Sequence, residues 1–322
     1  MADSPLTLVA EPIDPACASW LSERCAVEAI GADAPGFEGS LARADALIVR
    51  TYTRVDAALL AKAPRLLVVA RAGVGLDNID IPACRARGVE VVHTPDANSR
   101  AVVELATAFM LDALRPRLFL SSALDRAKWA ALRHELIAPR QCSDLTMGIY
   151  GMGRVGKAMA RVAAALDMRA LYCDLLEIPP ERRFGATPVS REALLAEADV
   201  VTLHVDDRPS NRGLIGPAAV RLMKRDAVFI NASRGFVVDA QALADFLANN
   251  PAAQAILDVH DPEPVAPDNP LLGMANAHLS PHIGAATATA HRNMSWVVRD
   301  VWRVLRGEKP EHPAPVRDWV SA

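Results

Sequence analysis

The sequence is poor in aromatic residues and in cysteine. Phe, Trp and Tyr make up 5% of the 322 residues. The cysteines are an odd number, lie far apart and include no C-x-x-C pair: Cys17, Cys25, Cys84, Cys142 and Cys173. Such spacing argues against a disulfide framework and against a zinc site. We therefore expect no bound metal.

Long apolar runs and blocks of like charge are also missing. No stretch approaches the roughly 20 apolar residues of a membrane-spanning helix. The N-terminus "MADSPLTLVAEP" lacks the basic segment and apolar core of a secretory signal. The formal net charge is −3 with both signs interspersed, which excludes an extended nucleic-acid or polybasic membrane surface. We expect a soluble, cytoplasmic protein that binds neither nucleic acid nor membranes.

Short apolar runs recur along the chain at regular intervals. The length predicts about two domains, and 51% hydrophobic residues are enough for substantial cores. Runs separated by Ala-rich helical segments indicate βα units and parallel sheets. The expected strands are 6–10, 26–30, 46–50, 66–71 and 89–94, then 146–151, 169–174, 198–205, 227–233, 253–259 and 277–280.

Two segments between and after these series have a helical period. Residues 98–115 carry apolar side chains at helical spacing, and residues from about Thr287 onward are helical again. Residues 121–144 are more polar, and we expect a helix plus an arm that extends to a partner subunit. The fold class is α/β with two Rossmann-like or flavodoxin-like domains. We expect a dinucleotide-type domain, 99–286 with a dimerisation helix and arm at 99–145, inserted into a substrate-binding domain of residues 1–98 and 287–322.

The strongest local motif is the G-x-G-x-x-G turn of Gly151, Gly153 and Gly156. A strand precedes it, a helix follows, and the next strand ends in Asp174. This context is typical of a dinucleotide-binding turn, where a helix N-terminus receives the pyrophosphate and the carboxylate receives ribose hydroxyls. The carboxylate favours NAD over NADP, although Arg182 and Arg183 follow shortly. An ordinary Gly-rich βα turn is the alternative.

Three candidates for chemistry follow predicted parallel strands: Arg234, Glu263 and His282. Ligands of open α/β sheets bind at the carboxyl ends of strands. Arginine can hold a carboxylate by two hydrogen bonds, and histidine can accept and donate a proton near neutral pH. Each residue alone has a structural alternative, as a surface ion pair, a solvated loop charge or a packed histidine. Together with the dinucleotide turn they predict hydride transfer to or from a 2-hydroxy acid.

The motifs resemble those of the D-isomer-specific 2-hydroxyacid dehydrogenases. The matching pieces run in family order through "RAGVGLDNID", "NSRAVVELA", "GIYGMGRVG", "FINASRGFVVD", "LDVHDPEP" and "LSPHIGA". The resemblance implies that His282 is the catalytic acid/base, Glu263 its partner, and Arg234 the residue that orients the substrate carboxylate. It also implies an NAD-dependent activity on the CH–OH group of donors, and a homodimer.

The resemblance extends to binding residues. Besides the glycines and Asp174, it implies cofactor contacts at Arg154, Val155, His204, Val205, Ala232, Ser233, Asp258, Gly284 and Ala285, with Asp258 on the nicotinamide carboxamide. It implies substrate contacts at Val74, Gly75, Asn98 and Arg234, with backbone N–H groups of the Gly73–Gly75 turn facing the carboxylate. A plain βα turn is the alternative for that turn. The sequence departs from the family pattern at Asp206 and Asp207, where a proline and an apolar residue are usual, and in the arm.

Within the family the chain looks most like 3-phosphoglycerate dehydrogenases. Arg50 and Arg71 end predicted strands and suit a substrate with a second anionic group, although each can instead pair with a neighbouring acid. Without an appended regulatory domain, the chain is expected to be a short form. The alternatives are a glyoxylate or hydroxypyruvate reductase, another D-2-hydroxyacid dehydrogenase, and an NAD-sensing corepressor-like binding protein.

Overall fold

A computed structural model describes residues 4–115 and 117–315 of the chain. The chain divides into two compact units, Met1–Asn98 with Ala285–Ala322, and Ser99–Gly284. We call them the outer unit and the inserted unit. The inserted unit ends at Gly284, whereas the sequence predicted that it would end at residue 286.

The outer unit contains a parallel sheet with the strand order β2-β1-β3-β4-β5. This order is that of a flavodoxin-like doubly wound sheet. All five strands coincide with predicted apolar runs. They are β1 (Leu6–Val9), β2 (Ala26–Ala29), β3 (Ala46–Val49), β4 (Val68–Arg71) and β5 (Glu90–Val92).

Helices cover both faces of this sheet because its central strands β1, β3 and β4 are apolar on both sides. Leu47 and Val69 pack with α2 (Phe37–Leu41), α3 (Ala57–Ala61) and α4 (Ile81–Ala86). Ile48 and Val68 pack instead with α1 (Pro15–Ser22) and α12 (Val298–Leu305). The predicted C-terminal helical segment is two helices, α11 (Ala288–Ser295) and α12, with Thr287 capping α11.

The inserted unit contains a parallel sheet with the order β12-β11-β10-β9-β6-β7-β8. Read from β8, this is the Rossmann order, with its switch point between β6 and β9. The strands are β6 (Thr146–Tyr150), β7 (Arg169–Cys173), β8 (Thr187–Pro188), β9 (Val200–Leu203), β10 (Val228–Asn231), β11 (Gln254–Leu257) and β12 (Ala277–Leu279). All but the two-residue β8 were predicted.

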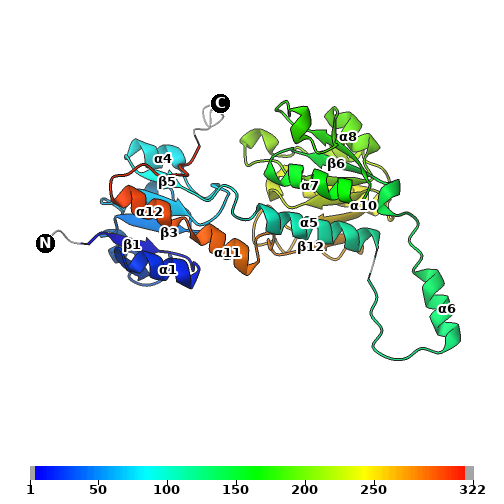
Figure 1. Ribbon diagram of the computed structural model, residues 1–322, viewed down its shortest axis with the longest axis horizontal. Coiled ribbons are helices and arrows are strands. Elements are labelled where there is room, and N and C mark those ends of the chain that lie inside the picture. Colours follow the sequence, from blue (N-terminus) through cyan, green and yellow to red (C-terminus); the bar gives the residue numbers. More distant parts are fainter. Residues whose placement is uncertain (1–3, 116, 316–322) are drawn as a thin grey trace. The chain divides into compact units, whose positions relative to one another are not determined.

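Two helical layers enclose this second sheet. Met147 and Ile149 belong to the core with α5 (Ser99–Leu114) and α7 (Arg154–Ala165), which lie side by side in Figure 1. Val201 and Phe229 pack with the opposite layer, α8 (Arg191–Glu197), α9 (Pro217–Val220) and α10 (Ala240–Asn249). Gly148 lets α8 pack closely against β6, since a Cβ there would lie 2.7 Å from that of Ala198.

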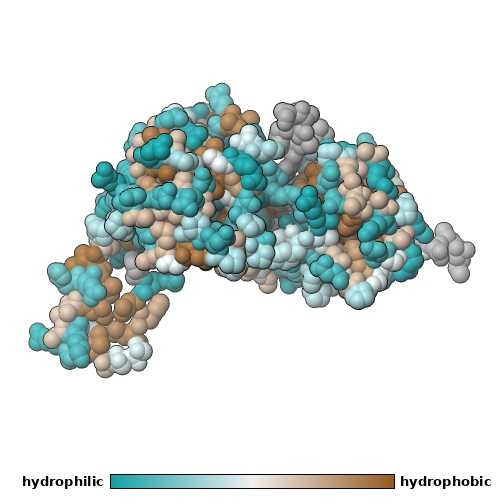
Figure 2. Space-filling view, turned by 180° about the vertical axis from the view of Figure 1, so that it is seen from behind, coloured by the Kyte–Doolittle hydropathy of each residue, from teal (hydrophilic) through white to brown (hydrophobic). Residues whose placement is uncertain are grey.

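The predicted arm leaves the layers of the inserted unit after α5. Its helix α6 (Arg126–Glu135) begins at the N-cap Asp125 and contains no buried residue. Figure 1 shows the arm standing away from the sheet, and Figure 2 shows apolar residues gathered on it. The large exposed apolar residues of this segment are Leu118, Phe119, Leu120, Trp129, Leu136 and Ile137.

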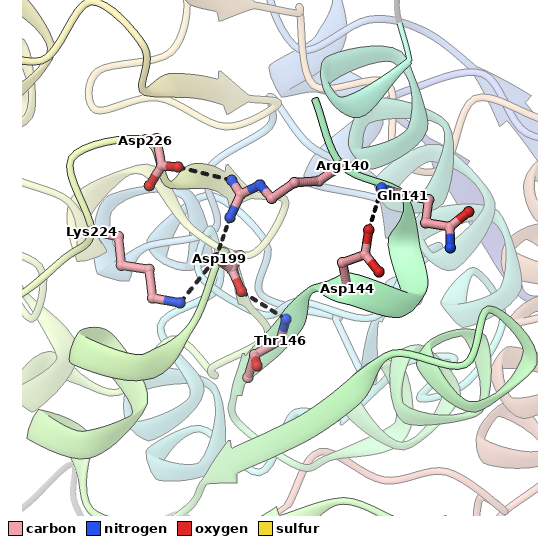
Figure 3. A network of polar contacts seen from close by, with 7 residues as sticks. All are labelled: Arg140, Gln141, Asp144, Thr146, Asp199, Lys224 and Asp226. Carbon is pink, nitrogen blue, oxygen red and sulfur yellow. Dashed lines mark hydrogen bonds and ion pairs between the residues drawn. The ribbon is translucent and has the colours of Figure 1, made fainter. Parts of the chain in front are cut away.

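A buried carboxylate anchors the chain where the arm returns to the sheet (Figure 3). Asp199, at the amino end of β9, accepts hydrogen bonds from Arg140 at 2.8 Å, Lys224 at 2.9 Å and the Thr146 N–H at 2.8 Å. Arg140 also contacts Asp226 at 2.9 Å. Burial alone would raise the pKa of Asp199, but these donors hold it below its ordinary value. The arm thus re-enters the unit at a fixed point.

Within residues 4–115 and 117–315, no helix combines the length and apolar character needed to cross a membrane. A cytoplasmic location stays a prediction of the sequence.

Candidate functional site

The three residues proposed for chemistry follow three neighbouring strands of the inserted unit. Arg234 follows β10, Glu263 follows β11 and His282 follows β12. These strands are adjacent and parallel. Their carboxyl ends therefore lie along one edge of the sheet, which is where ligands of open α/β sheets bind.

The imidazole of His282 is hydrogen-bonded to a carboxylate. Its Nδ1 lies 2.8 Å from Oε2 of Glu263. Because an ionised carboxylate only accepts hydrogen bonds, Nδ1 carries the proton and the neutral ring keeps Nε2 as its acceptor. This is the arrangement in which Nε2 can exchange a proton with a bound molecule.

The carboxylate of Glu263 is held from two sides. Its Oε1 accepts the backbone N–H of His260 at 3.0 Å, while Oε2 faces His282. Burial alone would raise the pKa of Glu263, but the hydrogen bonds from His282 and His260 and their positive charge hold it below the ordinary value. Glu263 is therefore ionised over the neutral range and can accept the Nδ1–H of His282.

The loop that carries His282 is shaped by a buried aspartate. His282 has φ 52, in the left-handed region that non-glycine residues rarely adopt. Asp258, 1% exposed, accepts the N–H of Ile283 at 2.8 Å, the N–H of Gly284 at 2.6 Å and the Ser280 hydroxyl at 2.6 Å. These contacts fix the backbone around the strained residue, as is common at functional sites. Asp258 therefore organises the loop that carries His282.

The turn that carries Arg234 is also held by hydrogen bonds. The fully buried Asn231 donates through Nδ2 to the Arg234 carbonyl at 2.9 Å and accepts the Ser233 hydroxyl at 2.8 Å. The guanidinium of Arg234 donates to the Ser233 carbonyl at 2.7 Å. Gly235 packs against the next loop, since a Cβ there would lie 1.9 Å from the His260 carbonyl carbon. The turns that carry Arg234 and Glu263 are thus in contact.

The glycine-rich turn after β6 has the geometry that the sequence predicts. Gly151 has φ +94, and a Cβ there would lie 2.5 Å from the His204 carbonyl oxygen. A Cβ on Gly156 would lie 2.0 Å from the Gly151 carbonyl oxygen, whereas Gly153 borders open space. Gly153 is also the N-cap of α7, and it has no side chain that could accept hydrogen bonds from the first N–H groups of the helix. The first N–H groups of α7 are therefore accessible to a pyrophosphate.

The carboxylate of Asp174 stands beside this turn. Its Oδ2 accepts the Met152 N–H at 2.5 Å and its Oδ1 the Leu176 N–H at 2.8 Å. Each oxygen keeps a second lone pair for a ribose hydroxyl. Open space at Gly153, the uncapped helix and this fixed carboxylate fit a dinucleotide.

The other predicted cofactor contacts lie on the same edge of the inserted unit, except Ala285, which begins the second segment of the outer unit. Arg154 is exposed at the start of α7, and Val155, Val205 and Ala232 are partly exposed. His204 follows β9 and its Nε2 lies 2.9 Å from the Thr202 hydroxyl. Enclosure of the ring lowers the pKa of His204 to about 3, so the imidazole is neutral at physiological pH.

The predicted substrate residues lie in the outer unit, apart from Arg234. Val49 pairs with Arg71 in the sheet, so Arg50 and Arg71 stand at the carboxyl ends of neighbouring strands. The guanidinium of Arg50 donates to the Pro12 carbonyl at 3.3 Å, and that of Arg71 to the Ala72 carbonyl at 3.2 Å.

The small-residue turn after β4 carries the substrate candidates Val74 and Gly75, whereas Asn98 lies directly before α5. A Cβ on Gly73 would lie 1.5 Å from Nη1 of Arg71, so this glycine makes room for the guanidinium. Val74, Gly75 and Asn98 are partly exposed.

Sequence reasoning missed residues that organise these loops. Glu11 accepts the backbone N–H groups of residues 50–53, at 2.9 to 3.2 Å, and so shapes the loop that carries Arg50. His260 donates its N–H to Glu263, and its Nε2 lies 2.8 Å from the Ser280 carbonyl oxygen. The position of each directly after a strand was the available signal. In residues 4–115 and 117–315, no group of three or more His, Cys, Asp and Glu has a metal-binding arrangement.

Comparison with known proteins identifies the family. Residues 107–284 match the model of the D-isomer specific 2-hydroxyacid dehydrogenase, NAD binding domain. A D-3-phosphoglycerate dehydrogenase of Archaeoglobus fulgidus is 37% identical over 86% of this chain and 51% of its own length. A glyoxylate reductase of Korarchaeum cryptofilum is 36% identical over 83% of this chain and 81% of its own length.

The fold has close counterparts among solved structures. The crystal structure of the TT0316 protein from Thermus thermophilus is 33% identical, has a TM-score of 0.82, and matches over 96% of this chain and 100% of its own. The chain spans about half the length of the phosphoglycerate dehydrogenases it matches. The family model, the relatives and the fold together show that this chain belongs to the D-isomer specific 2-hydroxyacid dehydrogenase family.

Proposed function

We propose that the chain is an NAD-dependent oxidoreductase that transfers a hydride between the cofactor and a D-2-hydroxy acid or its 2-keto acid. The 2.8 Å hydrogen bond between His282 Nδ1 and Glu263 Oε2 carries this proposal. His282 and Glu263 follow strands of the same sheet as the glycine-rich turn, and this pair can carry the proton transfer that accompanies hydride transfer. In this proposal the inserted unit binds NAD and the outer unit binds substrate.

Each proposed catalytic residue has one role. In the reducing direction His282 donates a proton from Nε2 to the keto oxygen, and the negative charge of Glu263 stabilises the imidazolium beforehand. Arg234 holds the substrate carboxylate through the planar fork of its guanidinium. When bound, the nicotinamide supplies the hydride.

NAD is the proposed cofactor, in preference to NADP. The carboxylate of Asp174 can accept ribose hydroxyls but repels a 2′-phosphate. The side chain of Arg183, one of the two arginines that kept NADP open in the sequence, donates to the Ile178 carbonyl at 2.7 Å. The predicted role of Asp258 toward the carboxamide remains part of the proposal, alongside its contacts to Ile283 and Gly284.

The proposed substrate pair is 3-phosphoglycerate and 3-phosphohydroxypyruvate. Arg50 and Arg71 stand at neighbouring strand ends and supply the charge for a second anionic group. The glyoxylate reductase among the relatives favours a second candidate, the reduction of glyoxylate or hydroxypyruvate.

The substrate is tested by NADH oxidation with phosphohydroxypyruvate, hydroxypyruvate, glyoxylate and pyruvate. We expect phosphohydroxypyruvate to have the highest kcat/KM. Arg50→Gln and Arg71→Gln are expected to raise KM for the phosphorylated substrate more than for hydroxypyruvate. A higher kcat/KM for hydroxypyruvate or glyoxylate would replace this assignment with the second candidate.

We further propose a homodimer that uses the arm. Phe119 is 82% and Ile137 69% exposed, and large apolar side chains gathered on one surface are typical of subunit contacts. Sedimentation of Phe119→Asp and Ile137→Asp is expected to show weaker association than wild type. Leu272→Asp, at an apolar residue outside the arm that is 45% exposed, is the matched control. Unchanged association of the two arm variants would place the interface elsewhere.

A further inference from the structure

The loop that follows β9 carries Asp206 and Asp207 where the family pattern has a proline and an apolar residue. The guanidinium of Arg208 forms a two-point ion pair with Asp206, with Nε 2.7 Å from Oδ1 and Nη2 2.6 Å from Oδ2. Asn211, 8% exposed, donates to Oδ1 and to the carbonyl of Asp206, each at 3.0 Å. The loop thus fixes this ion pair through its own contacts.

This loop borders the proposed cofactor site. A Cβ on Gly151 would lie 2.5 Å from the His204 carbonyl oxygen and 3.1 Å from the Val205 nitrogen. The next residue of the turn, Met152, donates its N–H to Asp174. The loop, the glycine-rich turn and the carboxylate that would face the ribose are therefore neighbours.

The carboxylates around Arg208 favour its charged form. Its hydrogen bond to Asp206 raises its pKa, and the negative charges of Asp206, Asp174 and Asp207 add to this effect. Asp174 thus has a guanidinium within electrostatic reach, and that guanidinium already gives its fork to another carboxylate.

The chemistry of the two cofactors differs at this place. A ribose 2′-hydroxyl donates a hydrogen bond to a carboxylate, whereas a 2′-phosphate needs a cation and is best held by an arginine fork. An arginine engaged at two points by a carboxylate offers neither its fork nor its full charge.

We propose that Asp206 is a second determinant of cofactor choice, which acts by holding the guanidinium of Arg208 away from a 2′-phosphate. This inference rests on the proposed function and concerns the adenosine end of the same site. In a site built this way, Asp174 repels the phosphate and Asp206 withholds the cation. Loss of the Asp206 charge makes Arg208 a phosphate ligand.

The test compares the affinities of the purified protein for 5′-AMP and 2′,5′-ADP by calorimetry at one ionic strength. Asp206→Asn keeps the shape of the side chain and its contact with Asn211. We expect it to shift the ratio of affinities toward 2′,5′-ADP by about tenfold, because a charge-assisted hydrogen bond forms. The double variant Asp206→Asn with Arg208→Ala should lose most of this gain.

Two further variants control for net charge. Asp245→Asn removes one negative charge on α10, where Gln241 is its partner, and should leave the ratio unchanged. Arg208→Lys conserves charge but cannot form the two-point pair, so it should shift the ratio toward 2′,5′-ADP by a smaller factor. This second variant keeps the inference testable should Asp206→Asn fold poorly.

The outcomes separate this inference from the proposed function. Equal gains in Asp206→Asn and in the double variant would show simple loss of repulsion and overturn the role of Arg208. No gain in either Asp206→Asn or Arg208→Lys would overturn the inference while NAD binding stands. Failure of the wild type to bind both 5′-AMP and NADH would overturn the proposed function itself.

Discussion

Replacing Gly235 by alanine should disable the site while leaving the cofactor turn intact. A Cβ on Gly235 would lie 1.9 Å from the carbonyl carbon and 2.0 Å from the carbonyl oxygen of His260, whereas ordinary contacts begin at 3.4 Å. Both clashing atoms belong to the backbone, so the His260 loop must move by about 1.5 Å, the difference between 3.4 and 1.9 Å. That loop supplies the N–H that holds Glu263.

The size of the effect follows from this displacement. Misplacing a catalytic group by about 1 Å can cost about a hundredfold in rate, or roughly 2.7 kcal/mol of transition-state stabilisation. Overpacking of this kind costs about 1–3 kcal/mol of folding stability. We therefore expect Gly235→Ala to lower kcat/KM for keto-acid reduction by about a hundredfold. The affinity for NADH should change only a few-fold, because the glycine-rich turn follows a different strand.

The assay is steady-state reduction at saturating NADH, with a thermal melt and NADH fluorescence titration of the same samples. Gly39→Ala is the control, since that glycine lies in a helix and nothing lies within 4 Å of the position that its Cβ would take. It should leave all three measurements unchanged. A Gly235→Ala protein with wild-type kcat/KM would refute the reasoning that contact between the two turns positions Glu263.

Three other predictions follow from buried or paired charges. Glu263→Gln removes the ionised acceptor of the His282 Nδ1–H, so kcat for keto-acid reduction should fall by about a hundredfold while NADH binding is retained; an unchanged kcat would contradict the pairing. The pKa of His204 is about 3 in the folded protein and about 6.5 in the unfolded chain, so between these pH values only the unfolded state binds a proton at this ring. The free energy of unfolding in urea should therefore fall as the pH drops from about 6.5 toward 3. His204→Gln should remove about one proton from this dependence, and an identical slope would count against a buried neutral ring. Arg140→Ala should lower the free energy of unfolding by about 1–2 kcal/mol in thermal melts, because it removes a hydrogen-bond donor from Asp199, which is 5% exposed. The control is Arg169→Ala, which breaks an exposed ion pair with Glu197 and should change this free energy by less than about 0.5 kcal/mol.

The strands were predictable because a parallel sheet is buried on both faces. Its strands therefore appear as continuous apolar runs, as in "LLVVAR" and "ADVVTLHV". The two-residue β8 gives no such run and was missed. The helical pattern after Thr287 was correct, but the break between α11 and α12 was not visible in it.

The pairing of His282 with Glu263 was predictable only from the family resemblance. Strand order decides which loop ends meet, and a single sequence does not encode that order directly. The contacts of Asn231, His260 and Asp258 depend on how neighbouring loops pack against one another. Contacts of that kind have no fixed spacing along the chain, so the sequence provided candidates for the reacting groups and missed most of the residues that hold their loops.

The central claim is that His282 provides the proton for hydride transfer to a 2-keto acid. The most direct measurement is a single-turnover reaction with NADH deuterated at the transferable position, comparing wild type with His282→Ala. We expect deuterium at the former keto carbon with wild type, and a large loss of rate with His282→Ala while NADH binding is retained. Equal rates in the two proteins, or no deuterium transfer by a wild type that binds NADH, would contradict it.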